Sequence, residues 1–324
     1  MRVLITGAAG MIGRKLTARL IKDTRLNGKP IEAVHLLDVV SHQIPVSPFR
    51  IEYHKGNVPE FDLQKLISTT KPDVIFHLAG IVSGEAEANF ELGYDVNLRG
   101  TWALFEALRQ AQIVPRVVFT SSIAVFGAPF PAVIPDDFHL TPLTSYGTQK
   151  MMSEALLADY TRKGLIDGIG IRLPTICVRP GTPNKAASGF FSNIIREPLA
   201  GLPAVLPVPR DVVHTHASPR SAINFLIHAA ALDGTLVGPR RNVSMPGVGV
   251  SVADMISALR NVAGEKATSL ISEIPDATIW SIVQNWPTRF EAKRGRDLGF
   301  VAENNFEEII QAHIEDELGG RLAK

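Results

Sequence analysis

The chain has 324 residues, of which 45% are hydrophobic and 20% are charged, and its formal net charge is +1. This composition is typical of a globular protein with a substantial core, and the balanced charge argues against a nucleic-acid-binding surface. No apolar stretch reaches the ~18 residues of a membrane span, and the strand-like run that begins at Arg2 leaves no room for a signal peptide. The single cysteine, Cys177, excludes an intrachain disulfide, and no Cys/His spacing predicts a metal site. We therefore expect a cytoplasmic protein in which Cys177 is a small buried residue.

In the first half of the chain, short apolar runs alternate with helical patterns. The expected strands are at 2–6, 33–38, 73–79, 116–122 and 168–174. The expected helices are at 13–21, 62–67, 92–111 and 145–163. Strands that are nearly continuous in Val, Ile and Leu, separated by helices, predict a parallel sheet covered on both faces. The fold class is therefore α/β, with a doubly wound (Rossmann) sheet.

After about residue 175 the alternation weakens, and prolines and glycines crowd residues 174–209. We expect loops and short helices there, suited to a substrate pocket, and a last helix at 306–318. The sequence thus predicts a Rossmann domain at 1–176 and a smaller substrate-binding region at 177–324. Parts of 212–233 are expected to return to the first domain.

A glycine-rich segment, TGAAGMIG, lies between the first strand and the first helix. Its residues Gly7, Gly10 and Gly13 allow the backbone to turn tightly and to approach a pyrophosphate at the helix N-terminus. Alone this spacing is a weak signal, because glycine is common at such turns. The second strand ends at Asp38, where a carboxylate can bind the hydroxyls of an adenosine ribose, although a plain loop acid is the alternative. No Arg or Lys follows within LLDVVSHQ, so NAD is favoured over NADP.

Ser122, Tyr146 and Lys150 form a second candidate constellation. Ser122 is at the C-terminal end of a strand, where ligands bind in open parallel sheets, and Tyr146 and Lys150 share one helix face. The pKa of a free tyrosine is about 10, and an ammonium group at ~5 Å favours the phenolate by roughly 3 kcal/mol, or about two pKa units. Tyr146 is then the base of a hydride transfer, Ser122 donates to the reacting oxygen, and Lys150 also holds the nicotinamide ribose. Each residue alone would more often be an ordinary strand-end or helix-face residue.

The ordered motifs resemble the extended short-chain dehydrogenase/reductase family, which contains NAD-dependent epimerases, dehydratases and related dehydrogenases. The motifs are TGAAGMIG, LLD (36–38), HLAG (77–80), VNLRGT (96–101), FTSSIAVFG (119–127) and SYGTQK (145–150). The resemblance covers nearly the whole chain.

This resemblance implies roles for further residues. Met11 and Ile12 would contact the pyrophosphate through their backbone, and Leu78 and Ala79 would line the path from adenosine to nicotinamide. Asn97 would support the catalytic residues. Two further cofactor contacts are expected at Pro174 and at Asn57, where many members carry an aspartate. Members usually form homodimers through helices equivalent to 92–111 and 145–163.

Segments of the second half resemble the D-erythronate dehydrogenase branch of this family. They are 172–181, 187–201, 209–222 and 245–255. Nucleotide-sugar epimerases usually carry an acidic residue where this chain has HTHASP, and Asp-x-Ser-Lys where it has EAKR (291–294). The expected substrate is therefore a short sugar acid, oxidised at its C2 hydroxyl to a 2-keto acid.

The carboxylate of such a substrate needs a cation or several neutral donors. The candidates are Arg179, Arg196 and Arg210, with Ser83, Thr175 and Asn193 as neutral donors. Phe190 and Phe191 would wall off a small pocket, although core packing explains one of them equally well. Each arginine alone would more often be a solvated surface group.

Three classes of protein remain open from the sequence. The first is an NAD-dependent dehydrogenase of a small sugar acid. The second is a nucleotide-sugar 4-epimerase or dehydratase, with a uronate dehydrogenase as a related alternative. The third is a non-catalytic dinucleotide sensor, but sensors often lose the tyrosine or the lysine, and this chain keeps both.

Overall fold

The computed structural model describes residues 1–41, 43, 45–181 and 188–322, which form two compact units. The first unit comprises Met1–Val125, Thr144–Leu173 and Ile223–Ser244. The second comprises the described residues within Phe126–Leu143, Pro174–Ala222 and Met245–Lys324. The division into folding domains near residue 176 stays a prediction. No helix among the described residues is long and apolar enough to cross a bilayer.

The first unit is built on a seven-stranded sheet in which all neighbouring strands are parallel. In spatial order the strands are β12 (Asn242–Ser244), β8 (Asp167–Leu173), β7 (Arg116–Ser122), β6 (Val74–His77), β1 (Arg2–Thr6), β4 (Ala33–Asp38) and β5 (Arg50–Lys55). From β1 the sheet grows through β4 and β5 on one side and through β6, β7 and β8 on the other, so the order reverses between β1 and β6. The predicted doubly wound α/β fold is confirmed.

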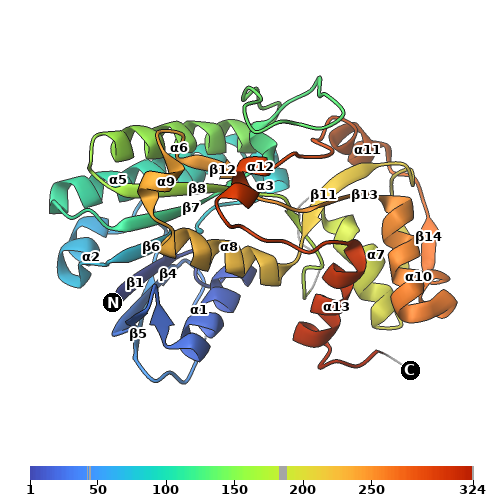
Figure 1. Ribbon diagram of the computed structural model, residues 1–324, viewed down its shortest axis with the longest axis horizontal. Coiled ribbons are helices and arrows are strands. Elements are labelled where there is room, and N and C mark those ends of the chain that lie inside the picture. The colour runs from blue at the N-terminus through green and yellow to red at the C-terminus, as the bar shows by residue number, and fades with distance from the viewer. Residues whose placement is uncertain (42, 44, 182–187, 323–324) are drawn as a thin grey trace. The chain divides into compact units, whose positions relative to one another are not determined.

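Helices cover both faces of this sheet (Figure 1). On one face α2 (Leu63–Thr70), α5 (Gly100–Ala111) and α6 (Ser145–Arg162) share an apolar core with the central strands. Figure 1 shows α1 (Met11–Asp23) and α8 (Pro219–Ala231) on the other face. Arg19 Nη1 donates to Asn224 Oδ1 at 3.0 Å and so joins α1 to α8.

The helix predicted over residues 92–111 is present, but it is not uniform. It consists of α4 (Phe90–Gly93), a π-helical segment η1 (Tyr94–Arg99) and α5. A wider π-helical turn is uncommon and is frequently found at functional sites. This irregularity was not predicted, because it depends on side-chain partners from α6 that are distant in the sequence.

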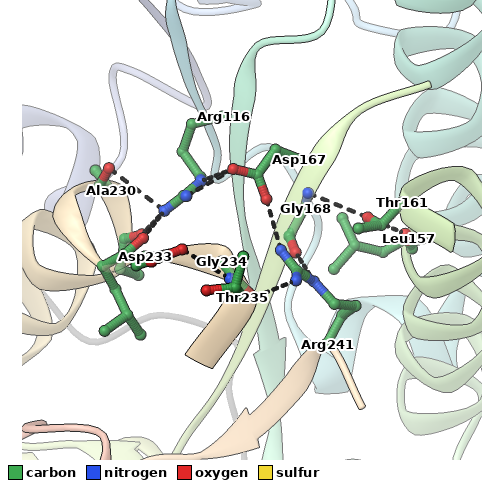
Figure 2. Close-up of polar contacts among 12 residues, drawn as sticks. Arg116, Leu157, Thr161, Asp167, Gly168, Ala230, Asp233, Gly234, Thr235 and Arg241 are labelled. Carbon is green, nitrogen blue, oxygen red and sulfur yellow. Dashed lines mark hydrogen bonds and ion pairs between the residues drawn. The ribbon is translucent and has the colours of Figure 1, made fainter. Parts of the chain in front are cut away.

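An ion-pair cluster ties together the N-terminal ends of three strands. Figure 2 shows Asp167, the first residue of β8, between the guanidinium groups of Arg116 and Arg241. Both N–O distances are 2.6 Å. Arg116 Nη1 also donates to the carbonyls of Ala229 and Leu232, both at 2.7 Å, at the end of α8. The cluster lies at the N-terminal ends of the strands, whereas the glycine-rich segment and Ser122 lie at their C-terminal ends. We therefore assign the cluster a structural role.

The second unit contains smaller sheets and three longer helices. The strands are β13 (Val248–Ser251), β11 (Val213–Ala217) and β9 (Thr175–Ile176) in one sheet, and β10 (Ala204–Leu206) with β14 (Ile271–Glu273) in another. The helices α7 (Gly189–Leu199), α10 (Val252–Thr268) and α13 (Phe306–Glu317) share one apolar core. The expectation that residues 174–209 contain no sheet was wrong for β9 and β10, because strands of two or three residues carry no local pattern. Cys177 is buried in this core, as expected.

The remaining elements are short. They are β2 (Arg25–Leu26), β3 (Lys29–Pro30), α3 (Ser83–Ala88), η2 (Ile123–Val125), α9 (Gly234–Val237), α11 (Ala277–Val283) and α12 (Lys293–Asp297).

Candidate active site

The glycine loop joins β1 to α1 where the strand order reverses. Gly7 has a φ of 73°, and a Cβ there would lie 2.6 Å from the backbone nitrogen of Ala79. A Cβ at Gly13 would lie 2.4 Å from the carbonyl oxygen of Gly7. Side chains are therefore excluded at both positions, because the backbone itself occupies the space. Gly10 is the N-cap of α1 and offers no side chain to its first turn.

This loop fits a pyrophosphate. Met11 and Ile12 are the first two residues of α1, so their backbone N–H groups belong to the helix end that carries partial positive charge. A glycine-lined approach to such a helix end is the arrangement that binds the phosphates of a dinucleotide.

Asp38 is held against the glycine loop at the end of β4. Its Oδ2 accepts from the N–H of Ala9 at 2.9 Å, and its Oδ1 accepts from the N–H of Val40 at 3.0 Å. The hydroxyl of Tyr53 donates to the Asp38 carbonyl at 3.0 Å. The carboxylate is thereby oriented beside the phosphate cradle, which suits an acceptor for ribose hydroxyls. Asn57 follows β5 in the adjacent turn, and its predicted adenine contact stays a prediction.

The segment that follows β6 runs along β1. The N–H groups of Leu78 and Ala79 donate to the Thr6 carbonyl and the Thr6 Oγ1, at 3.1 and 3.3 Å. His77 is fully buried between Thr6 Oγ1 at 2.7 Å and Thr101 Oγ1 at 2.9 Å. Burial lowers the pKa of His77 to about 3, so its ring is neutral and works as a hydrogen-bonded spacer. Leu78 and Ala79 are thus held beside Gly7, and their predicted place along the path from adenosine to nicotinamide stays a prediction.

Asn97 connects this segment to α6. Its Oδ1 accepts from the N–H of Ile81 at 2.9 Å, and its Nδ2 donates to Gln149 Oε1 at 2.8 Å. Its backbone carbonyl, within the π-helical segment, accepts from the hydroxyls of Thr101 and Ser153 at 2.7 and 3.2 Å. Asn97 is fully buried, and these contacts join the segment after β6 to α6, while its predicted support of the catalytic residues stays a prediction.

Tyr146 and Lys150 are placed by the start of α6. The helix begins after Thr144, whose hydroxyl accepts from the N–H of Gly147, a typical N-cap. Tyr146 is therefore in the first turn and Lys150 lies one turn later on the same face. Lys150 Nζ lies 5.8 Å from the centre of the Tyr146 ring. Ser122 ends β7, and its Oγ accepts from the backbone N–H two residues later at 3.1 Å.

Lys150 is buried, with an exposed fraction of 4%. Its Nζ donates to the Thr120 carbonyl at 2.8 Å and lies 4.8 Å from the centre of the Phe119 ring. Burial lowers the pKa of Lys150 to about 8, and Glu154 opposes part of that shift. A Cβ at Gly80 would lie only 2.9 Å from the buried Asn97 Oδ1, too close for a side chain without a shift, which explains the glycine in HLAG. At neutral pH the ammonium form of Lys150 therefore prevails, which places a positive charge 5.8 Å from the centre of the Tyr146 ring.

Several residues predicted to contact substrate or cofactor belong to the second unit. Thr175 Oγ1 lies 2.7 Å from His214 Nε2, and His214 Nδ1 lies 2.8 Å from the Pro287 carbonyl. Because a carbonyl only accepts, Nδ1 carries the proton and the Thr175 hydroxyl donates to Nε2. Phe191 is fully buried and stacks on His214, with ring centres 5.3 Å apart, so its contacts are those of a core residue. Pro174 joins β8 to β9.

The three candidate arginines differ in their partners. Arg196 and Arg210 each form an ion pair with a glutamate, at 2.5 and 2.7 Å, so a substrate carboxylate would have to compete for them. Arg179 donates to neutral groups, the Ile176 carbonyl and the Ser188 hydroxyl, both at 2.9 Å. Of the neutral donors, Ser83 begins α3 in the first unit, and Asn193 Oδ1 accepts from Arg196 at 2.7 Å.

The sequence analysis did not identify the buried polar residues that support Lys150. Gln149 is fully buried against Asn97. Glu154, one turn after Lys150, accepts from Arg172 Nη2 at 2.7 Å and from the Ser121 hydroxyl at 2.6 Å. Lys150 and Glu154 are four residues apart on one helix, and this spacing was a usable signal. The buried partners of Glu154 come from β7 and β8, which the spacing does not predict.

The doubly wound fold and the glycine-rich segment between β1 and α1 define an enzyme of the NAD(P)-binding Rossmann class. The chain belongs to the NAD dependent epimerase/dehydratase family, whose profile matches residues 3–216, and is thus an NAD(P)-dependent oxidoreductase. The expected family is confirmed.

Two curated relatives are D-erythronate dehydrogenases. The protein from Cupriavidus necator is 44% identical over 98% of both chains. The protein from Haemophilus influenzae is 40% identical over 97% of this chain and 99% of its own. A crystal structure described as a nucleoside-diphosphate-sugar epimerase from Agrobacterium tumefaciens is 59% identical, covers 100% of this chain and 96% of its own, and superposes with a TM-score of 0.97. These relatives are named for different reactions: two are named as dehydrogenases and one is described as an epimerase.

Proposed function

We propose that this protein is an NAD-dependent dehydrogenase that oxidises the C2 hydroxyl of D-erythronate to 2-oxo-tetronate. The observation that carries the proposal is the near-full-length identity of 44% and 40% to two D-erythronate dehydrogenases. The buried Lys150 beside Tyr146 supports it. The relative that is 59% identical is described as an epimerase, and the alternative is therefore an epimerase that uses bound NAD catalytically. The distinction is whether reduced cofactor accumulates.

In the proposed reaction Tyr146, as phenolate, takes the proton of the C2 hydroxyl. Lys150 is placed to stabilise the phenolate through its positive charge, since its Nζ lies 5.8 Å from the centre of the Tyr146 ring. The Ser122 hydroxyl donates to the same oxygen and orients it. NAD held by the glycine-rich segment and Asp38 would supply the acceptor for the C2 hydrogen and its electron pair. The substrate loses one hydride and one proton, and Tyr146 passes its proton on to solvent.

NAD is the proposed cofactor rather than NADP. The Asp38 carboxylate is oriented by Ala9 and Val40 and can accept from two ribose hydroxyls. A 2′-phosphate at that position would meet a negative charge at close range. The proposed cofactor contacts also include Pro174 and Asn57.

Arg179, Ser83 and Thr175 are proposed to bind the substrate, with Arg179 as the cation for its carboxylate. Replacing Arg179 with Lys removes the paired, planar donors while keeping the charge. The KM for D-erythronate should rise and the KM for NAD should stay unchanged. Phe191 is proposed to shape the substrate region through packing.

A homodimer is proposed through α5 and α6. Trp102 on α5 is 52% exposed, which is unusual for so large an apolar side chain. Light scattering on the wild type and on Trp102→Glu tests this: a dimer that the variant converts to a monomer supports the interface, and a wild-type monomer refutes it.

The substrate is tested directly by following NADH absorbance with NAD and a panel of candidates. D-Erythronate should be oxidised with net NADH. Turnover of galacturonate but not of erythronate would instead indicate a uronate dehydrogenase. Epimerisation of UDP-glucose without net NADH would refute the dehydrogenase, and no turnover with retained NAD binding would indicate a sensor.

A further inference from the structure

Three side chains that can bind a metal ion converge on the outer strands of the sheet. His35 lies on β4, and Glu52 and His54 lie on β5, the edge strand (Figure 1). β4 and β5 are parallel, and His35 is paired with Glu52 in their register. Side chains alternate between the faces of a strand, so His54, two residues after Glu52, lies on the same face.

The spacing of the three ligand atoms is that of a metal site. His35 Nδ1 lies 3.2 Å from Glu52 Oε2 and 3.2 Å from His54 Nε2. All three atoms lie within 4.8 Å of one another. Tetrahedral zinc with bonds of about 2.0–2.2 Å separates neighbouring ligand atoms by roughly 3.3–3.6 Å. Two of the three separations are therefore within about 0.1 Å of that range, and the third, which is within 4.8 Å, is the one that metal binding would set.

Hydrogen bonding alone satisfies this cluster only in part. His35 Nδ1 faces two partners but can carry only one proton. If it is protonated, the Glu52 carboxylate and His54 Nε2 must share that one proton. If it is unprotonated and accepts from His54, its lone pair faces the Glu52 carboxylate. A cation removes the conflict, because each of the three atoms then contributes a lone pair.

The electrostatic setting keeps the ligands ready. Burial lowers the pKa of His35 and of His54, and the neutral imidazole is the form that binds a metal. Glu52 opposes the shift at both rings, while Arg50 and Arg2 add to it at His35. Arg50 forms an ion pair with Glu52 Oε1, the carboxylate oxygen that the histidines do not use. Such a partner orients a ligating carboxylate. The Glu52 side chain is 33% exposed, so an ion can enter from solvent.

We propose that His35, Glu52 and His54 form a binding site for Zn²⁺ or a similar divalent transition metal, with one position left to water. The ion links the edge strand to β4. Three residues further along β4 lies Asp38, so the site stabilises the strand end that orients the proposed ribose-binding carboxylate. The site is separate from Ser122, Tyr146 and Lys150, and its existence does not depend on the proposed substrate.

The test uses the full chain, freed of metal by a chelator. Equilibrium dialysis against Zn²⁺ with metal analysis should give one bound ion per chain, and added Zn²⁺ should raise the melting temperature. Co²⁺ should give the visible absorption of a tetrahedral complex. Glu52→Gln and His54→Gln should each raise the Zn²⁺ Kd at least about tenfold, since even outer-shell changes cost that much. His139→Gln, at an exposed histidine outside the cluster, is the matched control and should bind as the wild type does.

Retained NAD affinity in each variant shows that it has folded. The proposal is overturned if the wild type binds no Zn²⁺, if binding survives in both cluster variants, or if His139→Gln weakens it equally.

Discussion

Replacing Lys150 with Met should make the cofactor-free chain more stable at pH 7 while removing its dehydrogenase activity. Burial lowers the pKa of Lys150 from 10.5 to about 8, which corresponds to a cost of about 3 kcal/mol for the charged form in the folded chain. Methionine removes that cost but also loses the hydrogen bond to the Thr120 carbonyl, worth about 1 kcal/mol. The free energy of unfolding should therefore rise by about 2 kcal/mol.

The sign of the pH dependence makes this prediction specific. Between pH 8 and pH 10.5 the unfolded lysine holds its proton while the folded one loses it. Wild-type stability therefore rises with pH in this window, and the advantage of Lys150→Met shrinks. Below pH 8 both states are protonated and the difference is constant.

Urea unfolding of both proteins at pH 7 and pH 10, without NAD, measures this difference. Lys65→Met is the matched control, because Lys65 is exposed on α2 and its loss should produce no such pH dependence. A variant less stable than the wild type at pH 7, or a difference that does not change between the two pH values, would refute the reasoning. Such an outcome would mean that Lys150 carries no burial cost as an ammonium group.

Four further predictions follow from the same contacts. Tyr146→Phe should lower kcat by about 10²–10⁴-fold while NAD affinity, measured by calorimetry, stays near the wild-type value, and near-normal turnover would remove the base from the proposed mechanism. Asp38→Ala should raise the KM for NAD about tenfold and reduce the preference for NAD over NADP. A wild type that turns over faster with NADP would contradict the ribose-binding role of Asp38. Gly7→Ala should weaken NAD binding and lower stability together. Gly28→Ala should cost only about 1 kcal/mol of stability, because Gly28 has a φ of 70° but nothing within 4 Å of its added Cβ. Equal effects of the two substitutions would argue against the backbone clash at Gly7. Asp167→Ala should lower the free energy of unfolding by about 2–3 kcal/mol without changing the KM for NAD. An unchanged unfolding midpoint would show that the ion pairs of Asp167 with Arg116 and Arg241 do not stabilise the fold.

The strands and helices of the first unit were predictable where the pattern is local. The runs RVLIT and RVVFTSS form β1 and β7 as expected, because strands buried on both faces must be continuously apolar. The polar strand RIEYHK was missed, because β5 lies at the sheet edge and has the mixed composition of a partly exposed surface. The π-helical turn around Asn97 was missed as well, because Gln149 and Ser153, which bind it, are about fifty residues away.

The sequence by itself determined the strand–helix alternation of a doubly wound fold, the glycine-rich segment, the acid at Asp38 and the pairing of Tyr146 with Lys150. Each of these depends on neighbours in the chain: a period of two or 3.6 residues, a turn that excludes side chains, or a spacing of four on a helix. Only the tertiary structure decided that Lys150 is buried and that Glu154 is shared by Arg172 and Ser121. The convergence of His35 with Glu52 and His54 was equally invisible in the sequence, because it depends on the register of two parallel strands. Burial and register are set by which segments pack together, and a single sequence does not record those contacts.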